Sequence, residues 1–314
     1  MEKILITGAC GQLGTELTRS LAWHYGRNSV VASDILHEAP ENLDVAYTQL
    51  DVLDAEHLRL LAHHQGVTQI YHLAATLSAT GEKHPLSGWD LNMQGLLNVL
   101  EVARTNKIRV FWPSSIAVFG AHLNTAFTPQ HSLLEPATVY GISKVAGELW
   151  CKYYFERYGV DVRSLRYPGL ISHSAPPGGG TTDYAVDIFL HAAKSKAYTC
   201  YLQEHTILPM LYMPDAIRAT LELMEADPKK LSVRTSYNLH GLSFNPRELA
   251  KAIQKRLPDF SVHYAPDERQ RIADTWPGAV DDHYARNDWR WNARYDLDAM
   301  CDDMLAHLTT TTYV

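Results

Sequence analysis

The stretch ILITGACGQLG, at residues 4–14, joins a short apolar run to a helical pattern through three glycines. Gly8 can form the tight turn, Gly11 lets a pyrophosphate approach the backbone, and Gly14 lets the helix pack closely on the strand. The pyrophosphate then lies at the helix N-terminus, where free N–H groups and the helix dipole favour an anion. This spacing of glycines at a strand-to-helix turn predicts a dinucleotide-binding fold.

An acidic residue follows at the distance that such a fold requires. Asp34 ends the next apolar run, about 20 residues after the last glycine, where a carboxylate binds the ribose hydroxyls of the adenosine. Because a carboxylate there repels the 2′-phosphate of NADP, we predict NAD as the cofactor. Asp51, after the third apolar run, is a second candidate for the adenine edge and an equally good candidate for a helix N-cap.

Short β-rich runs alternate with helical patterns through the first half of the chain. This alternation predicts an α/β fold with a doubly wound parallel Rossmann sheet. We expect residues 1–167 to form the NAD-binding domain and residues 168–314 to form mainly a smaller, interwoven α/β substrate lobe. A long loop is predicted over residues 168–180. The expected strands are 3–7, 29–33, 45–50, 69–73, 109–114, 161–167, 199–202, 236–239 and 262–264, and expected helices include 143–158, 183–194, 214–225, 245–257 and 296–308.

Composition narrows the class of protein. The 314 residues carry 28 basic and 35 acidic side chains, and this balance argues against a nucleic-acid partner, which would need a basic field. No stretch approaches the ~18 apolar residues of a membrane span, so no membrane partner is expected. The first residues show no signal or transit pattern, which favours a cytoplasmic location. The four cysteines lie far apart and the 16 histidines lack ligand spacing, so no metal is expected.

A second group of residues is suited to general acid–base catalysis. Tyr140 and Lys144 stand four residues apart, on one face of a helix, and Ser115 ends a preceding strand. A phenol has a pKa of about 10, so a tyrosine base near neutral pH must lose its proton about 3 pH units below that value. One cation at about 4 Å supplies roughly that effect, and we expect Lys144 to be one such cation and the oxidised nicotinamide to be a second. A surface pair is the alternative interpretation, but the strand-ending serine and the dinucleotide motif favour catalysis.

The chain resembles the extended short-chain dehydrogenase/reductase family over nearly its whole length. It shares the glycine loop, the Tyr140 and Lys144 pair with a preceding serine, an HLAA turn at residues 72–75, and Asn92 on a helix. The resemblance implies that Ser115 positions a substrate hydroxyl, Tyr140 is the base and Lys144 also holds the nicotinamide ribose. The expected cofactor-binding residues are Gly8, Gly11, Gln12, Leu13, Gly14, Asp34, Asp51, Val52, Leu73, Ala74, Ala75, Asn92, Tyr140, Lys144, Tyr167 and Pro168.

Two anchors typical of sugar-nucleotide enzymes in this family are missing. Gly169 takes the place of an asparagine, and Leu208 takes the place of the arginine that binds diphosphate. Because burying a diphosphate without a cation is costly, a sugar nucleotide is disfavoured. An NAD-dependent sugar-nucleotide epimerase or dehydratase stays open as an alternative. So does a non-catalytic NAD-binding regulator, although such proteins commonly lose the tyrosine or the lysine that this chain keeps.

A different small-molecule site is indicated by the run GGGTTD at residues 178–183, which leads into a helix. Its glycines allow close backbone approach, and threonine hydroxyls at a helix start can receive a carboxylate. An ordinary threonine N-cap on a loop is the alternative. Asp183 could face an ammonium group or solvent. The expected substrate-binding residues are Ser78, Ser115, Tyr140, Gly179, Thr181 and Thr182.

Within the wider family, several segments are similar to the L-threonine 3-dehydrogenases of the short-chain type. They are LSA at 77–79, RYPGLIS at 166–172, GGGTTDYAV at 178–186 and a C-terminal run over 276–297, in which Arg290 departs from a common glycine. The resemblance implies oxidation of the L-threonine 3-hydroxyl to 2-amino-3-ketobutyrate, with NADH formed. It also implies a homodimer, formed by the helices that carry Asn92 and Tyr140.

Overall fold

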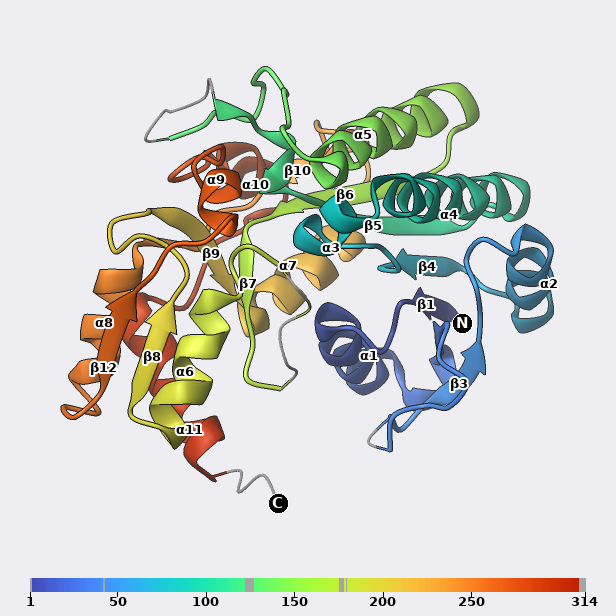
Figure 1. Ribbon diagram of the computed structural model, residues 1–314. Coiled ribbons are helices and arrows are strands. Elements are labelled where there is room, and N and C mark those ends of the chain that lie inside the picture. Colours follow the sequence, from blue (N-terminus) through green and yellow to red (C-terminus); the bar gives the residue numbers. More distant parts are fainter. Residues whose placement is uncertain (1, 42, 122–126, 175–177, 179, 311–314) are drawn as a thin grey trace.

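The computed structural model describes residues 2–41, 43–121, 127–174, 178 and 180–310, and Figure 1 shows two packed parts. The larger part holds a seven-stranded parallel sheet in the order β10-β6-β5-β4-β1-β2-β3. Its strands are β1 (Ile4–Thr7), β2 (Val30–Asp34), β3 (Ala46–Gln49), β4 (Gln69–His72), β5 (Arg109–Ser115), β6 (Val162–Tyr167) and β10 (Tyr237–Asn238). The strand order reverses between β1 and β4, and ligands of such sheets bind outside the carboxyl ends at that point.

Helices cover both faces of this sheet, as its strands, buried on both sides, require. One face carries α2 (Ala55–Gln65), α4 (Pro85–Asn106) and α5 (Val139–Tyr158), with α3 (Ser78–Lys83) beside them. The other face carries α1 (Gln12–Tyr25) and α7 (Met213–Glu225), which pack together (Figure 1). The predicted doubly wound α/β fold is confirmed.

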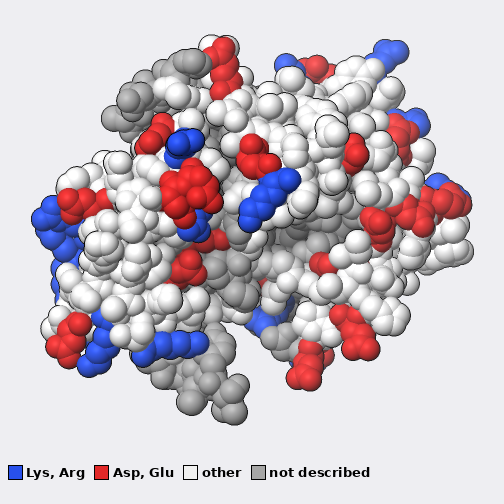
Figure 2. Space-filling view, viewed as in Figure 1, with Lys and Arg blue, Asp and Glu red and all other residues white. Residues whose placement is uncertain are grey.

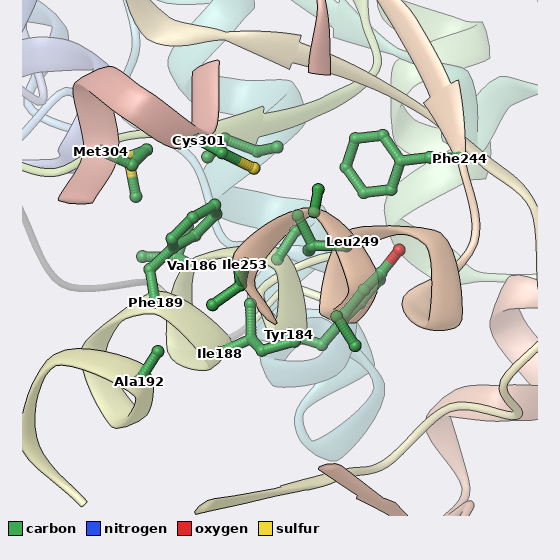
Figure 3. Close-up of a cluster of buried hydrophobic side chains, with 14 of the residues drawn as sticks. Tyr184, Val186, Ile188, Phe189, Ala192, Phe244, Leu249, Ile253, Cys301 and Met304 are labelled. Atoms are coloured by element: carbon green, nitrogen blue, oxygen red, sulfur yellow. The ribbon is translucent and has the colours of Figure 1, made fainter. Parts of the chain in front are cut away.

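The smaller part contains two small sheets around a separate core. One sheet has the order β11-β9-β7 (Leu242–Phe244, Leu208–Tyr212, Gly169–Ile171), and the other pairs β12 (Ser261–Tyr264) with β8 (Ala197–Cys200). Figure 3 shows Tyr184 and Phe189 of α6 (Tyr184–Lys194) meeting Leu249 of α8 (Pro246–Gln254) and Met304 of α11 (Leu297–Thr310). The remaining short helices are η1 (Arg27–Ser29), η2 (Ile116–Val118), α9 (Arg269–Ala273) and α10 (His283–Trp289).

The structure corrects three local predictions. The predicted loop over residues 168–180 contains β7, which β9 holds by parallel pairing. The wholly buried β9 was not predicted, because Pro209 interrupts its pattern and a proline normally argues against a central strand. Helix α5 begins at Val139, four residues before the predicted start, because the Thr138 side chain accepts a hydrogen bond from Gly141 N at 3.0 Å and caps it.

Candidate functional site

A cavity of about 270 Å³ lies at the carboxyl ends of β1, β4, β5 and β6. Most of the residues that the sequence singles out line it. These are Gly8, Gly11, Gln12, Leu13, Gly14, Leu73, Ala75, Ser78, Ser115, Tyr140, Lys144, Tyr167, Pro168, Thr181 and Thr182. Residues far apart in the chain therefore converge where the sheet order reverses, the place that the topology favours for a ligand.

The glycine loop has the close backbone contacts that its sequence predicts. Gly8 has a φ of +74°, and a Cβ atom on it would lie 2.6 Å from Ala74 N. A Cβ atom on Gly14 would lie 2.2 Å from the carbonyl oxygen of Gly8. The Nε2 atom of Gln12 is buried without a hydrogen-bond partner in the described structure, and Gln12 lines the cavity. A bound pyrophosphate and its attached groups would supply a partner to this donor, so the loop fits a dinucleotide.

Asp34 lies at the outer edge of this loop, at the end of β2. Its carboxylate accepts a hydrogen bond from Cys10 N at 3.0 Å, which ties the strand end to the glycine turn. Asp34 does not line the cavity itself. The carboxylate still stands beside the glycine turn on the adjacent strand, where the ribose of a bound adenosine would reach it.

Tyr140 and Lys144 lie in the first two turns of α5, and both line the cavity beside Ser115. Lys144 Nζ donates to the carbonyl oxygen of Pro113 at 2.7 Å and lies 5.4 Å from the centroid of the Tyr140 ring. A hydrogen bond joins the side chains of Tyr140 and Ser115. The three predicted catalytic residues are thus brought together, although they come from two elements.

Comparisons with known proteins agree with this geometry. Residues 4–239 match the family described as the NAD dependent epimerase/dehydratase family. The chain belongs to this family. An uncharacterized epimerase/dehydratase of Staphylococcus haemolyticus is 48% identical over 309 residues, covering 97% of each chain.

Two solved structures are also similar to this chain over nearly its full length. A GalE-like L-threonine dehydrogenase from Cupriavidus necator, in a holo form, is 55% identical with a TM-score of 0.96, covering 98% of this chain and 99% of that one. The L-threonine dehydrogenase of Clostridium difficile is 46% identical with a TM-score of 0.95, covering 98% of both chains. The chain is an enzyme of the NAD-dependent dehydrogenase/epimerase family, and NAD is its cofactor.

Three predicted cofactor-binding residues, Asn92, Val52 and Ala74, are not among the described residues that line the cavity. The Asn92 side chain accepts from Thr76 N at 2.8 Å and donates to Ser143 Oγ at 3.1 Å, so it ties the segment after β4 to α5. Val52 is buried, and Ala74 packs against the backbone of the glycine turn. The contact of these three residues with NAD stays a prediction.

Three further predictions concern Asp51, Gly179 and Asp183. Asp51 is exposed and accepts from Leu53 N at 2.9 Å, while Asp54 caps α2, so its alternative as an N-cap is wrong. Gly179 lies outside the described residues. Asp183 lines the cavity, and its carboxylate accepts from Gly180 N at 2.6 Å, so it stabilises the turn before α6.

The electrostatics of Tyr140 differ from the expectation. Burial raises the pKa of Tyr140 to about 12, and the hydrogen bond with Ser115 lowers it only in part. Burial also lowers the pKa of Lys144 to about 7, so this amine is only partly charged at neutral pH. In the protein without its cofactor, desolvation therefore outweighs the lowering of the Tyr140 pKa expected from Lys144, and the share expected from the oxidised nicotinamide stays a prediction.

We expect Lys144→Met to raise the thermal stability of the cofactor-free protein, and to raise it most below pH 7. The folded protein holds Lys144 with a pKa of about 7 against an ordinary value of 10.5, so the unfolded chain binds more protons between these values. The stability of the wild type therefore rises across this window, and the variant lacks that gain. Unfolding midpoints at pH 6, 8 and 10 check this; a stability difference that stays constant with pH would refute it.

A buried ion pair joins α5, the helix that carries Tyr140 and Lys144, to β6. Glu148 lies one turn after Lys144 on α5, and its carboxylate is 2.7 Å from Arg166 Nη2 of β6. Ser114 Oγ donates to the same carboxylate at 2.6 Å. Arg166 also donates to the Asn238 side chain of β10 at 3.1 Å. This network joins β5, β6, β10 and α5 directly behind the cavity.

Several residues that line the cavity are not among the site residues predicted from the sequence. Pro113, Ser114, Ile116, Leu170 and Trp276 line the cavity. The first three lie beside Ser115, so their position at the end of β5 could have indicated them. Trp276 comes from a segment far along the chain, and no local pattern places it here.

Proposed function

We propose that this protein oxidises the 3-hydroxyl group of L-threonine with NAD and forms 2-amino-3-ketobutyrate and NADH. The observation that carries the proposal is Thr181, whose hydroxyl is buried without a partner in the described structure and whose side chain lines the same cavity as Tyr140. A buried hydroxyl of this kind calls for a polar ligand group. The similarity to L-threonine dehydrogenases along nearly the whole chain supports the same substrate.

Each of the site residues has a separate role in the proposed reaction. Bound NAD supplies the hydride acceptor and a positive charge near the tyrosine. Tyr140 takes the proton of the substrate hydroxyl as the C3 hydrogen leaves with its electron pair. Ser115 donates a hydrogen bond to the reacting oxygen and holds it in line. Lys144 lies where it can hold the nicotinamide ribose, and Asp34 where it can hold the adenosine ribose.

The opposite wall of the cavity would hold the amino-acid part of the substrate. Thr181 and Thr182 stand directly before α6, and Ser78 begins α3; all three side chains line the cavity. Hydroxyls and free N–H groups at such positions suit a carboxylate. Leu77, Leu170 and Trp276 provide apolar surface for the substrate's methyl group.

Replacing Thr181 with valine is expected to raise the KM for L-threonine about 10-fold while leaving the affinity for NAD unchanged. The change keeps the shape of the side chain and removes one hydrogen bond to a charged group. Steady-state kinetics and NAD titration measure the two effects. Thr105→Val, on the surface of α4, serves as the matched control. An unchanged KM would remove Thr181 from the substrate site.

The cavity gives less support to a sugar nucleotide. Leu208 is fully buried within β9 and does not line the cavity. Among the described lining residues, Lys144 is the only cation. A sugar diphosphate beside the cofactor would therefore lack the positive charge that a buried phosphate needs.

A substrate panel tests the proposal against its alternatives. Purified protein is given NAD with L-threonine, L-allo-threonine, L-serine, 3-hydroxybutyrate or UDP-galactose, and NADH absorbance is followed. The proposal predicts NADH formation that is fastest with L-threonine. Interconversion of UDP-galactose without NADH would favour the epimerase, and NAD binding without any turnover would favour the regulator.

We also propose that the protein is a homodimer formed through α4 and α5. These helices expose large apolar side chains, which monomers seldom gather on one surface. They include Leu86, Trp89, Ile142, Leu149, Trp150 and Tyr153. Light scattering after gel filtration is expected to give twice the mass of one chain, and a monomer mass would contradict this assembly.

A further inference from the structure

Three side chains that commonly bind metals meet away from the cavity, in the smaller part of the molecule. His173 follows β7, and Asp303 and His307 lie one turn apart on α11. Each offers one ligand atom, and these atoms all lie within 4.8 Å of one another. We propose that His173, Asp303 and His307 form a binding site for a divalent transition metal, with zinc as the preferred ion.

The second polar atom of each side chain is already engaged, and this orients the first. His307 Nδ1 lies 2.9 Å from the backbone oxygen of Asp303, and His173 Nδ1 lies 3.4 Å from Ser174 Oγ. Each ring offers one of its nitrogens to the cluster. Metal-binding histidines typically hold their other nitrogen in this way.

The carboxylate is held in the same manner. Tyr212 donates to Asp303 Oδ2, and Asp303 Oδ1 lies 3.6 Å from His307 Nδ1, inside the cluster. The two imidazole rings are stacked, with centroids 3.9 Å apart and planes 10° from parallel. Ligand atoms of a tetrahedral zinc site, at about 2.0–2.2 Å from the ion, lie roughly 3.3 Å apart. The ligand atoms lie within 4.8 Å of one another, and a small rotation of the exposed His307 side chain can bring them to this spacing.

The charges around the cluster also suit a cation. Burial and the positive charges of His307 and Arg19 lower the pKa of His173, while the carboxylates of Glu16 on α1 and Asp303 face it with negative charge that a cation would meet. Glu16 and His173 line the same groove, so Glu16 or a water molecule can occupy the fourth position. Two imidazoles with a carboxylate are a donor set typical of zinc, whereas magnesium and calcium prefer oxygen ligands.

A bound ion would connect distant parts of the chain. His173 follows β7, whereas Asp303 and His307 lie on α11, the last helix of the described structure. Cross-linking them is expected to stabilise the folded state, because the ion binds a site that the unfolded chain lacks. The inference does not depend on the proposed reaction, since none of its three ligands lines the cavity.

Calorimetric titration of the untagged full chain with zinc chloride tests the site. We expect one zinc per chain, and at least a 10-fold weaker affinity in both His173→Gln and His307→Gln. The double variant His63→Gln/His64→Gln removes two exposed histidines from α2 and is the matched control, with unchanged affinity. Zinc at about 100 times its Kd should raise the unfolding midpoint of the wild type by about 5 °C, and that of His307→Gln by much less.

Cobalt gives a second readout that reports geometry. Cobalt bound by the wild type is expected to show the intense visible absorption of a four-coordinate ion, and His307→Gln should lose it. Because His307 is exposed, this variant remains informative if His173→Gln does not fold. Zinc binding that is absent from the wild type, that persists unchanged in His307→Gln, or that is lost in the control variant would overturn the proposal.

Discussion

Tyr140→Phe is expected to lower kcat for L-threonine oxidation by about 10³-fold and to leave NAD binding intact. The change removes only the hydroxyl that takes the substrate proton, and positioned acid–base groups contribute 10²–10⁴-fold to a rate. The half-buried ring still lines the cavity, so its packing is retained. NADH absorbance measures the rate, and quenching of intrinsic fluorescence measures the affinity for NAD.

Two comparisons make the tyrosine prediction specific. Tyr264→Phe removes one hydroxyl from β12, far from the cavity residues, and should leave kcat unchanged. In the wild type, kcat/KM should rise with pH, because burial raises the pKa of Tyr140 and the base form becomes available as pH increases. A Tyr140→Phe enzyme that keeps more than a tenth of the activity would assign the base to another group.

Arg166→Met is expected to lower the free energy of unfolding by about 3–5 kcal/mol. The Arg166 and Glu148 side chains are 4% and 1% exposed, and their charged atoms lie 2.7 Å apart. Removing the guanidinium leaves a buried carboxylate without its countercharge, and the loss of that partner costs more than the lost contact itself. Urea unfolding followed by circular dichroism measures the change.

The control for this prediction is an ion pair at the surface. Arg59 lies 2.6 Å from Glu56 on α2, and both side chains are largely exposed. Arg59→Met should therefore leave the unfolding midpoint unchanged, since water already screens the pair. Equal effects in the two variants would show that burial does not govern the strength of the Arg166 interaction.

Local patterns explain why much of the site could be predicted from the sequence. The glycine turn and the four-residue spacing of Tyr140 and Lys144 each encode their geometry within one strand-to-helix turn or one helix, and Asp34 follows the glycines at the distance that this fold requires. Ser115 could be placed because parallel strands end at the same edge of the sheet. In these cases the chemistry and the backbone are specified by neighbours in the chain.

Features that depend on distant parts of the chain were not predicted. The contact of Arg166 with Glu148 requires knowing that β6 lies beside α5, and β9 is a strand despite Pro209 because β7 and β11 flank it. His173 and His307 have no sequence spacing that suggests a shared site, yet the fold stacks their rings. The high pKa of Tyr140 likewise comes from tertiary burial, which the helix spacing does not reveal.

Isotope labelling tests directly whether the protein transfers the C3 hydrogen of L-threonine to NAD. The protein is incubated with NAD and L-threonine that carries deuterium on C3, and the NADH is analysed by mass spectrometry. If the C3 hydrogen of L-threonine is the transferred hydride, each NADH will carry one deuterium, and hydride transfer will be slower than with unlabelled substrate. Unlabelled NADH, or no NADH at all, would show that the C3 hydrogen of threonine is not the hydride this protein transfers.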